Sequence, residues 1–238
     1  MTDNLSVIIP ARNEALTLPG SLSALFNSAR MASCELEVIV VINRCSDATE
    51  QVAKDHGCTV VHSDAKNLAI IRNAGVRAAS NEFVATVDAD SIVCEEMITN
   101  VLRELHKPNV VGGGVMIYPS RYSLGILLTG FMLLPIALWH GISAGFFFFR
   151  RKDFDAIYGF NEELVSVEDI DFAKRLRDFG KRDGRRFVTL WRTYITTSTR
   201  KFDRFGDWYF LLRPHLLMKL FRGNDTKAAN EVWYDFER

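Results

Sequence analysis

The sequence predicts an α/β fold in which helices flank a doubly wound, mostly parallel sheet. Short apolar segments and amphipathic segments alternate four times in the first half of the chain, as in successive strand–helix–strand units. The apolar segments carry β-branched residues on both faces, which is typical of strands in a sheet covered on both sides. A length of 238 residues suits one large domain of this kind.

The first half supplies four predicted strands, at 5–11, 36–43, 58–63 and 83–88. Apolar residues at helical spacing, with polar residues between them, predict amphipathic helices in the intervening segments. These helices cover 14–30, 46–56 and 66–80. Because ligands bind at the carboxyl ends of the strands in such sheets, the residues just after each strand are expected to form the functional site.

The second half is less regular and predicts longer elements. A helix is expected over 167–180, with Gly180 in the position of a C-cap glycine. A further helical segment is broken near Pro214, because proline restricts the residue before it. The remaining predictions are strands at 110–118, 142–149 and 187–198, and the broken helix at 205–222.

The composition excludes several classes of function. Lysine plus arginine equals aspartate plus glutamate, at 29 each, so no overall basic field favours nucleic acid. The cysteines at 34, 45, 58 and 94 form no CxxC pair, which argues against a zinc site and fits a reducing cytosol. The N-terminal residues "MTDNLSVIIPARNE" have neither a basic leader nor a long apolar region. A cytoplasmic protein is therefore expected.

One long segment carries no Asp, Glu, Lys or Arg, from Tyr122 to Phe149. About 20 apolar residues can span a bilayer, but glycines and a proline interrupt this run. We expect a core helix over 122–138, followed by a buried strand. An apolar helix resting on a membrane surface stays open, with the protein peripheral at the inner face of the membrane. A span is least favoured, because it would separate Asp90 from Asp169 if these share one site.

Two aspartates follow the fourth predicted strand in the stretch "FVATVDADS". Asp88 and Asp90 can be interpreted as a helix cap and a turn residue. They can also be interpreted as ligands of Mg²⁺ or Mn²⁺, because hard oxygen ligands at a strand end suit a cation that holds a diphosphate. A single DxD pair does not decide between these interpretations.

Three other stretches stand before and after the acidic pair: "VIIPARNEALTLPGSLSAL", "NLAIIRNAGVRAAS" and "GFNEELVSVEDIDFAKRLRDFG". In this order and spacing, the four stretches resemble the family 2 glycosyltransferases with the GT-A fold. The resemblance covers roughly residues 5–180. It implies a nucleotide-sugar-binding half over 1–118, an acceptor-binding and catalytic half over 119–200, and a C-terminal helical extension over 201–238.

The resemblance assigns roles to individual positions. Asp90 matches the principal metal ligand, with Asp88 beside it and near the ribose. Arg72 matches an arginine that approaches the diphosphate, against the alternative of a surface ion pair. The nucleotide-binding positions implied by the resemblance are Pro10, Ala11, Arg12, Asn13, Glu14, Arg72, Asp88 and Ala89.

The motif "VEDID" matches the acidic motif of the family, whose second acid acts as the general base. Asp169 is therefore the candidate base that deprotonates the acceptor hydroxyl. Glu168 and Gly114 are expected on the acceptor side. The alternative for Glu168 and Asp169 is a structural one, because acids favour the first turn of a helix.

The chain departs from the family pattern in two places. Asn43 stands where many relatives carry an aspartate that reads the base; its amide offers both a donor and an acceptor. The QxxRW motif of processive members is absent, and "TSTRKFDRFGDW" lies in that region instead. Arg200 could close over the diphosphate there, or belong to a solvated basic loop. The missing motif favours transfer of one sugar per encounter.

The resemblance thus implies a metal-dependent, inverting transfer from a nucleoside-diphosphate sugar, with UDP-sugars favoured, to a saccharide or lipid-linked acceptor. Mn²⁺ or Mg²⁺ is the implied cofactor, and a membrane surface is a further potential partner. Two other classes stay open. A nucleotidyltransferase usually begins with a Gly-rich loop and a lysine, which "PARNE" lacks. An inactive binding protein is supported by the departure at Asn43, whereas Asp90 and Asp169 argue against it.

Overall fold

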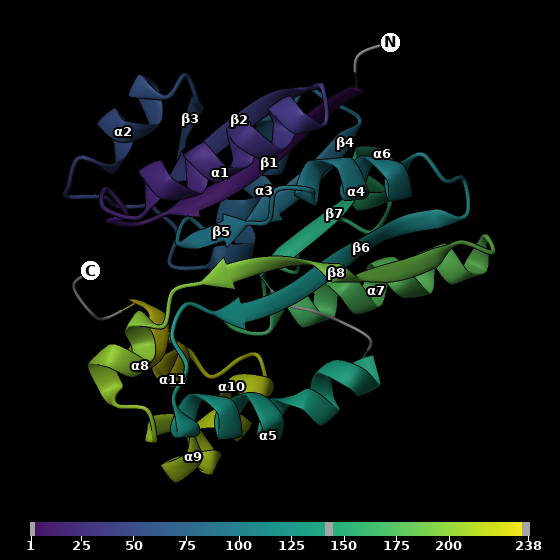
Figure 1. Ribbon diagram of the computed structural model, residues 1–238. Coiled ribbons are helices and arrows are strands. Elements are labelled where there is room, and N and C mark those ends of the chain that lie inside the picture. The colour runs from purple at the N-terminus through teal and green to yellow at the C-terminus, as the bar shows by residue number, and fades with distance from the viewer. Residues whose placement is uncertain (1–2, 141–144, 235–238) are drawn as a thin grey trace.

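The computed structural model describes residues 3–140 and 145–234, and its centre is one eight-stranded sheet (Figure 1). The strand order is β3-β2-β1-β4-β7-β6-β8-β5. β7 is antiparallel to both of its neighbours and β5 is antiparallel to β8, whereas the other pairings are parallel. The strands are β1 Asp3–Ala11, β2 Cys34–Ile42, β3 Thr59–His62, β4 Phe83–Val87, β5 Ser91–Val93, β6 Val110–Pro119, β7 Phe146–Arg150 and β8 Arg186–Thr197.

Helices cover both faces of this sheet and leave two apolar cores. Residues of α1 and α4 pack into one core, and residues of α3 and α7 pack into the other. The main helices are α1 Leu18–Met31, α2 Thr49–Asp55, α3 Leu68–Ala78, α4 Met97–Leu105, α5 Leu124–His140, α6 Arg151–Ala156 and α7 Glu168–Arg182. The C-terminal part holds α8 Arg200–Phe205, α9 Tyr209–Leu212, α10 Pro214–Phe221, α11 Thr226–Ala229 and the π-helix η1 Asn230–Tyr234.

The predicted mostly parallel sheet is confirmed, and its reason is visible in β1. Val7, Ile8 and Ile9 point to alternate faces and all three are fully buried. A strand can bury both faces only where helices cover both sides of the sheet. Each of the four strands predicted in the first half is present, with ends within two residues of the expected ones.

Two predictions about helices were wrong in detail. The first helix starts at Leu18 and not at residue 14, because residues 12–17 form the turn that follows β1. Gly180 is not a C-cap: α7 continues to Arg182, and Asp183 caps it. Gly180 lies inside the helix against Val111, where an added Cβ would crowd that side chain. The elements β5, α4 and α6 were not predicted.

The uncharged segment forms a helix and a buried strand, as expected, but the helix is not a core helix. Leu124 and Phe131 of α5 are 64% and 73% exposed. The four phenylalanines of β7, 146–149, are fully buried. Residues 142–144 of the predicted strand lie outside the described residues. Over the described ranges, no helix is long and apolar enough to cross a membrane.

One close approach positions α3 on the sheet. Gly75 faces β1 and β2, and an added Cβ would collide with the side chains of Ile8 and Val41. The helix therefore lies closer to the sheet than any residue with a side chain would permit. Arg72 is carried one turn earlier on the same helix.

Candidate functional site

The loop after β1 is tied to the loop after β2 by hydrogen bonds. Asn13 adopts a left-handed backbone conformation, with φ of 52°, which asparagine tolerates better than most residues. Its Oδ1 accepts a hydrogen bond of 2.8 Å from the backbone N–H of Ser46. The N–H of Glu14 donates to Thr49 Oγ1 at 2.7 Å. These bonds fix the direction in which the Glu14 side chain leaves the loop.

Glu14 meets an arginine from the distant end of the chain. Arg200 in α8 donates from Nη1 to Glu14 Oε2 at 2.7 Å and from Nη2 to Oε1 at 2.5 Å. The same Nη2 lies 3.0 Å from Asp90 Oδ2. We call Glu14, Asp90 and Arg200 the Arg200 cluster. It joins the ends of β1 and β4 to the C-terminal part through one guanidinium and two carboxylates.

The two aspartates after β4 differ in exposure. The side chain of Asp90 is 14% exposed, whereas that of Asp88 is 40% exposed. Burial raises the pKa of Asp90, and the nearby Arg200 guanidinium opposes that rise. Ala89 between them is buried, and its carbonyl accepts a hydrogen bond of 2.7 Å from Ser21 of α1. The turn that carries both aspartates is therefore anchored to a helix.

A second arginine bridges two further acids. Arg72 is almost fully buried, donates from Nη2 to Asp88 Oδ1 at 2.9 Å, and donates from Nη1 to Glu168 Oε1 at 2.7 Å. Its guanidinium also lies 5.5 Å from the ring centre of Phe160, within the range of a cation–π contact. We call Arg72, Asp88 and Glu168 the Arg72 cluster. This contact is a buried ion pair and not the surface pair considered from the sequence.

The first turn of α7 separates its two leading acids. Val167 before it has φ of 54°, a rare and strained value for a β-branched residue. Glu168 is buried on Arg72, and burial raises its pKa despite that contact. Asp169 is half-buried; its Oδ1 accepts from the N–H of Ile170 at 2.8 Å. Burial also raises the pKa of Asp169, again opposed by Arg72.

Other predicted site residues lie around these clusters without joining them. Asn43 is buried and donates from Nδ2 to the carbonyls of Ser63 and Ala65, at 2.6 and 2.8 Å. Its amide hydrogens thus hold the loop after β3, and a contact with a base stays a prediction. Gly114 lies within the sheet, opposite Phe147 of β7. Pro10, Ala11 and Arg12 end β1 and begin the loop that leads to Glu14.

The family model described as "Glycosyl transferase family 2" matches residues 6–158, which is more than half of the chain. The chain belongs to glycosyl transferase family 2. The match includes the loop after β1, Arg72 and both aspartates after β4, and it ends before α7.

Curated relatives share part of this region. An uncharacterised glycosyltransferase of Mycobacterium tuberculosis is 32% identical over 105 residues, which cover 44% of this chain and 45% of that protein. A protein of Mycobacterium bovis with the same description matches to the same extent. The match thus spans about half the length of these curated relatives.

Solved structures resemble nearly the whole chain. Residues 1–349 of S. aureus TarS give a TM-score of 0.62 at 20% identity, covering 97% of this chain and 68% of that chain. The mannosyltransferase PcManGT from Pyrobaculum calidifontis, in complex with GDP-Man and Mn²⁺, gives 0.68 at 18% identity, covering 96% and 64%. At these identities the likeness shows the fold, and the predicted GT-A architecture is confirmed.

Sequence reasoning missed two asparagines that support the site of this family member. Asn73 donates from Nδ2 to the carbonyl of Phe160 and accepts from its N–H at Oδ1, both at 2.9 Å. Asn67 donates to the carbonyls of Glu162 and Leu164. Together they hold the loop that leads into Glu168. The signal was their place in "NLAIIRNAG": Asn73 is a polar amide on the buried face of α3, and Asn67 is its N-cap, and buried amides need partners.

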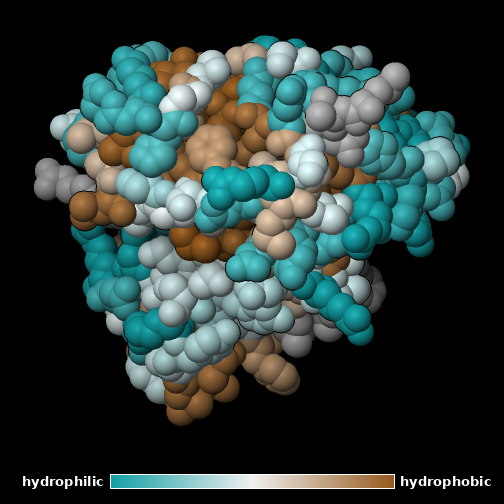
Figure 2. All heavy atoms as spheres, turned by 45° about the horizontal axis from the view of Figure 1, so that its top comes forward, coloured by the Kyte–Doolittle hydropathy of each residue, from teal (hydrophilic) through white to brown (hydrophobic). Residues whose placement is uncertain are grey.

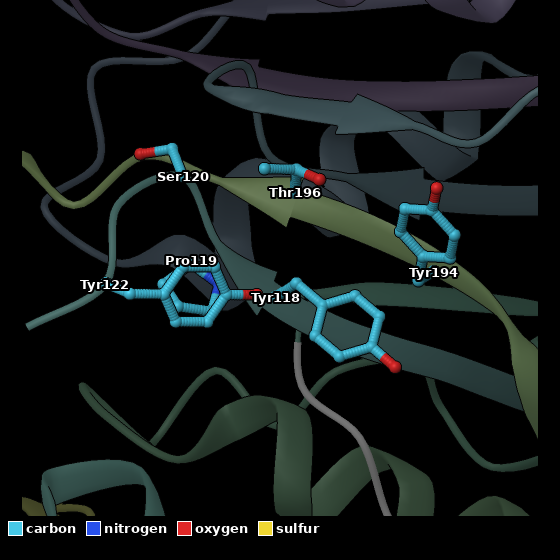
Figure 3. A pocket seen from close by; sticks show the side chains of 6 residues that line it. All are labelled: Tyr118, Pro119, Ser120, Tyr122, Tyr194 and Thr196. Carbon is cyan, nitrogen blue, oxygen red and sulfur yellow. The ribbon is translucent and has the colours of Figure 1, made fainter. Parts of the chain in front are cut away.

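A hollow of about 520 Å³ was missed as well. It lies at the carboxyl ends of β6 and β8, and Figure 3 shows tyrosines from both strands around it. The rings of Tyr118 and Tyr194 meet edge to face, with centres 5.2 Å apart. These residues stand outside the family motifs, so no sequence signal pointed to them. The lining residues are Tyr118, Pro119, Ser120, Tyr122, Tyr194 and Thr196.

Proposed function

We propose that this chain is a metal-dependent, inverting and non-processive glycosyltransferase. It moves one sugar from a nucleoside-diphosphate sugar, with UDP-sugars favoured, to an acceptor hydroxyl. The observation that carries the proposal is the pair of arginine clusters at the carboxyl edge of the sheet. They gather four acids from β1, β4 and α7 beside two cations, where a charged donor and a metal ion can be held.

The acids after β4 fit a divalent cation. Among the described residues, no group of three or more His, Cys, Asp and Glu side chains is arranged to hold a metal ion. Sites for Mg²⁺ or Mn²⁺ at diphosphates, however, need only one or two carboxylates, because phosphate oxygens and water complete the shell. Asp90, with Asp88 beside it, provides that donor set. A bound cation would neutralise the charge that develops on the departing diphosphate.

The remaining donor contacts come from this chain's own loops. The nucleoside is proposed to lie against the loop from Pro10 to Glu14 and beside Asn43. Arg200 is 30% exposed and touches both Glu14 and Asp90. Its guanidinium can therefore turn towards a diphosphate held at Asp90, with the bidentate geometry that arginine offers to phosphate.

Asp169 is the proposed general base. Its carboxylate takes the proton of the acceptor hydroxyl while the oxygen bonds to the anomeric carbon and the bond to the diphosphate breaks. One displacement of this kind inverts the anomeric configuration. Its raised pKa brings the base closer to neutral pH, where general-base catalysis is most effective. Glu168, fixed on Arg72, sets the start of the helix that carries this base.

The acceptor is proposed to bind in the tyrosine-lined hollow. Aromatic rings and hydroxyl groups together suit a saccharide, because a sugar has apolar faces and polar edges. Tyr118 and Tyr194 provide the rings, and Ser120 and Thr196 provide hydroxyl groups. Glu168 and Gly114 stay predicted on this acceptor side. Both a free saccharide and a lipid-linked one fit this chemistry.

Calorimetric titration with UDP, GDP and CDP, each with and without Mn²⁺, tests the proposal. We expect metal-dependent binding of one nucleotide, and its loss in Asp90→Asn. Asp178→Asn makes the same chemical change at an exposed acid on α7 and is the control. Folded protein that binds none of the three would overturn the proposal. Binding without any turnover of the matching sugar nucleotide would instead favour an inactive binding protein.

A further inference from the structure

An apolar stripe on α5 faces solvent. The apolar residues of this stripe follow the spacing i, i+3, i+4 and i+7, which places them on one side of the helix. The opposite side packs inward through Gly125, Ile126 and Thr129, which are buried. The exposed residues of the stripe are Leu124, Leu127, Leu128 and Phe131.

The C-terminal helices extend this apolar surface. α5 packs against the segment before α9, since an added Cβ on Gly125 would collide with the backbone of Asp207. Leu212 at the end of α9 is exposed, and so are Met218 and Phe221 of α10. Figure 1 shows α5, α9 and α10 side by side below the sheet. Figure 2 shows apolar residues at the lower edge of the face that it draws.

The charged residues within the apolar segments of this surface are basic, and the acids at its edges are paired, Asp207 with Arg121 at 2.7 Å. Residues 122–140 contain no Asp, Glu, Lys or Arg, and residues 208–224 contain three basic residues and no acid. Arg213 forms an ion pair of 3.0 Å with Glu231. Lys219 and Arg222, at the end of α10, are both exposed. A surface that combines apolar side chains with cations is complementary to a layer of anionic lipid headgroups.

Aromatic residues stand at the margin of the same surface. Tyr122 precedes α5 and Trp208 precedes α9, and both are exposed. Such rings are enriched where a protein meets the headgroup region, because one side of the ring is apolar and the other carries a hydrogen-bonding group. Their position supports a lipid surface over a second copy of the chain, for which the excess of positive charge would be repulsive.

We propose that the surface formed by α5, α9 and α10 docks peripherally on an anionic lipid bilayer. The apolar stripe of α5 enters the headgroup boundary, while Lys219 and Arg222 contact the acidic headgroups. No part of the chain needs to cross the bilayer for this. The inference concerns attachment, and its test needs no nucleotide, so its outcome is independent of the proposed sugar transfer.

Sedimentation with sucrose-loaded vesicles tests this docking. The two compositions are phosphatidylcholine alone and phosphatidylcholine with about 30 mol% phosphatidylglycerol, whose negative surface potential attracts basic segments. We expect the folded full chain to bind the anionic vesicles and to leave the neutral ones largely unbound. Binding should weaken at about 1 M salt, where the screening length falls to about 3 Å. Equal failure to bind both compositions would overturn the proposal.

Two pairs of variants locate the contact. The double variant Lys219→Gln/Arg222→Gln should lower binding to anionic vesicles by roughly tenfold or more. Lys181→Gln with Arg182→Gln, exposed at the end of α7, makes the same charge change and should have little effect. Phe131→Gln should also weaken binding, whereas Met31→Gln on the exposed end of α1 should not.

Light scattering without lipid distinguishes lipid docking from dimerisation through the same surface. If the chain forms a dimer that Phe131→Gln dissociates, and binds neither vesicle composition, the surface is an interface between two copies and the lipid proposal is wrong. Equal losses from the α7 and α10 charge variants would likewise contradict it, because they would show a general effect of net charge.

Discussion

The Arg72 cluster and the Arg200 cluster have the same chemistry in different settings. In each, one guanidinium bridges two carboxylates, and one of the two aspartates after β4 takes part. Arg72 is 3% exposed and lies on a helix packed into the core. Arg200 is 30% exposed and lies on a short helix without buried residues.

This difference indicates different roles. A buried arginine paired with a buried acid, as Arg72 is with Glu168, cannot move without leaving a charge unpaired in a medium of low dielectric constant. Arg72 therefore fixes the positions of Asp88 and Glu168. An arginine that is partly in water can exchange one anionic partner for another at lower cost. Arg200 is suited to contact a ligand that binds between Glu14 and Asp90.

Replacing Arg72 is expected to have the largest effect on stability. Arg72→Ala should lower the free energy of unfolding by about 3–5 kcal/mol, because Glu168 would stay buried without its partner. Urea denaturation followed by circular dichroism measures this change. Arg77→Ala on the same helix is the control, since its pair with Glu162 is exposed and 3.8 Å long.

A loss below about 1 kcal/mol would contradict the view that the Arg72 cluster is structural. If Arg72→Ala does not fold, Arg72→Lys decides the question. Lysine keeps the charge but lacks the fork that reaches two carboxylates at once, so an intermediate loss of stability is expected.

The two acids at the start of α7 should separate activity from stability. Asp169→Asn is expected to lower the rate of donor hydrolysis, with water as acceptor, by about a hundredfold or more. Its unfolding free energy should change little. Glu168→Gln should act mainly on stability, because Glu168 belongs to the Arg72 cluster. The reverse pattern would assign the base to Glu168.

Replacing Arg200 should alter both stability and ligand binding. Arg200→Ala is expected to cost about 2–3 kcal/mol of stability, because Glu14, whose side chain is 2% exposed, would lose its charged partner. It should strengthen binding of Mn²⁺ alone, because Arg200 contacts Asp90 Oδ2 at 3.0 Å and competes for that oxygen. It should weaken binding of the metal–nucleotide pair by roughly tenfold.

Calorimetry with Mn²⁺, and then with nucleotide and Mn²⁺ together, measures both quantities. Arg204→Ala on the same helix is the control, because Arg204 is exposed and outside the cluster. Weaker binding of both ligands would show that Arg200 only supports the fold of the loop.

The pH dependence of donor hydrolysis tests the role of Asp169 as general base through the smallest expected effect. Asp169 is active as a base only when deprotonated, and its pKa is raised by burial. Activity should therefore be full above this raised pKa and fall as pH decreases through it. That fall should occur at a higher pH than the usual aspartate value of about 4. In Asp169→Asn this acidic limb should disappear, whereas a limb that persists would belong to another group.

The sequence predicted the acids but could not predict their partners. Asp88 and Asp90 follow an apolar strand, and Glu168 and Asp169 stand in a short motif, so local pattern was sufficient for them. Arg72 pairs with Glu168 across 96 residues of sequence, and Arg200 pairs with Glu14 across 186. Pairings of that kind follow from the packing of the whole sheet, which no local pattern encodes.

The same limit explains what the sequence left open or got wrong about the fold. Four phenylalanines correctly indicated a buried strand at β7, but a strand that is apolar on both faces does not show whether its neighbours are parallel or antiparallel. The composition of α5 indicated a core helix. Exposure depends on which elements lie nearby, and an apolar stripe has the same sequence whether it faces a core or a lipid surface.

The site depends on the absence of a side chain at Gly75, and substitution there is expected to disturb it. The residue carries no side chain that could join either cluster, yet it sets how near α3 lies to β1 and β2. Any larger residue would move the helix outward and carry Arg72 away from Asp88 and Glu168. Position 75 is therefore expected to tolerate substitution as poorly as the charged positions of the Arg72 cluster. The reason is steric, because only the hydrogen atom of glycine fits between α3 and the sheet.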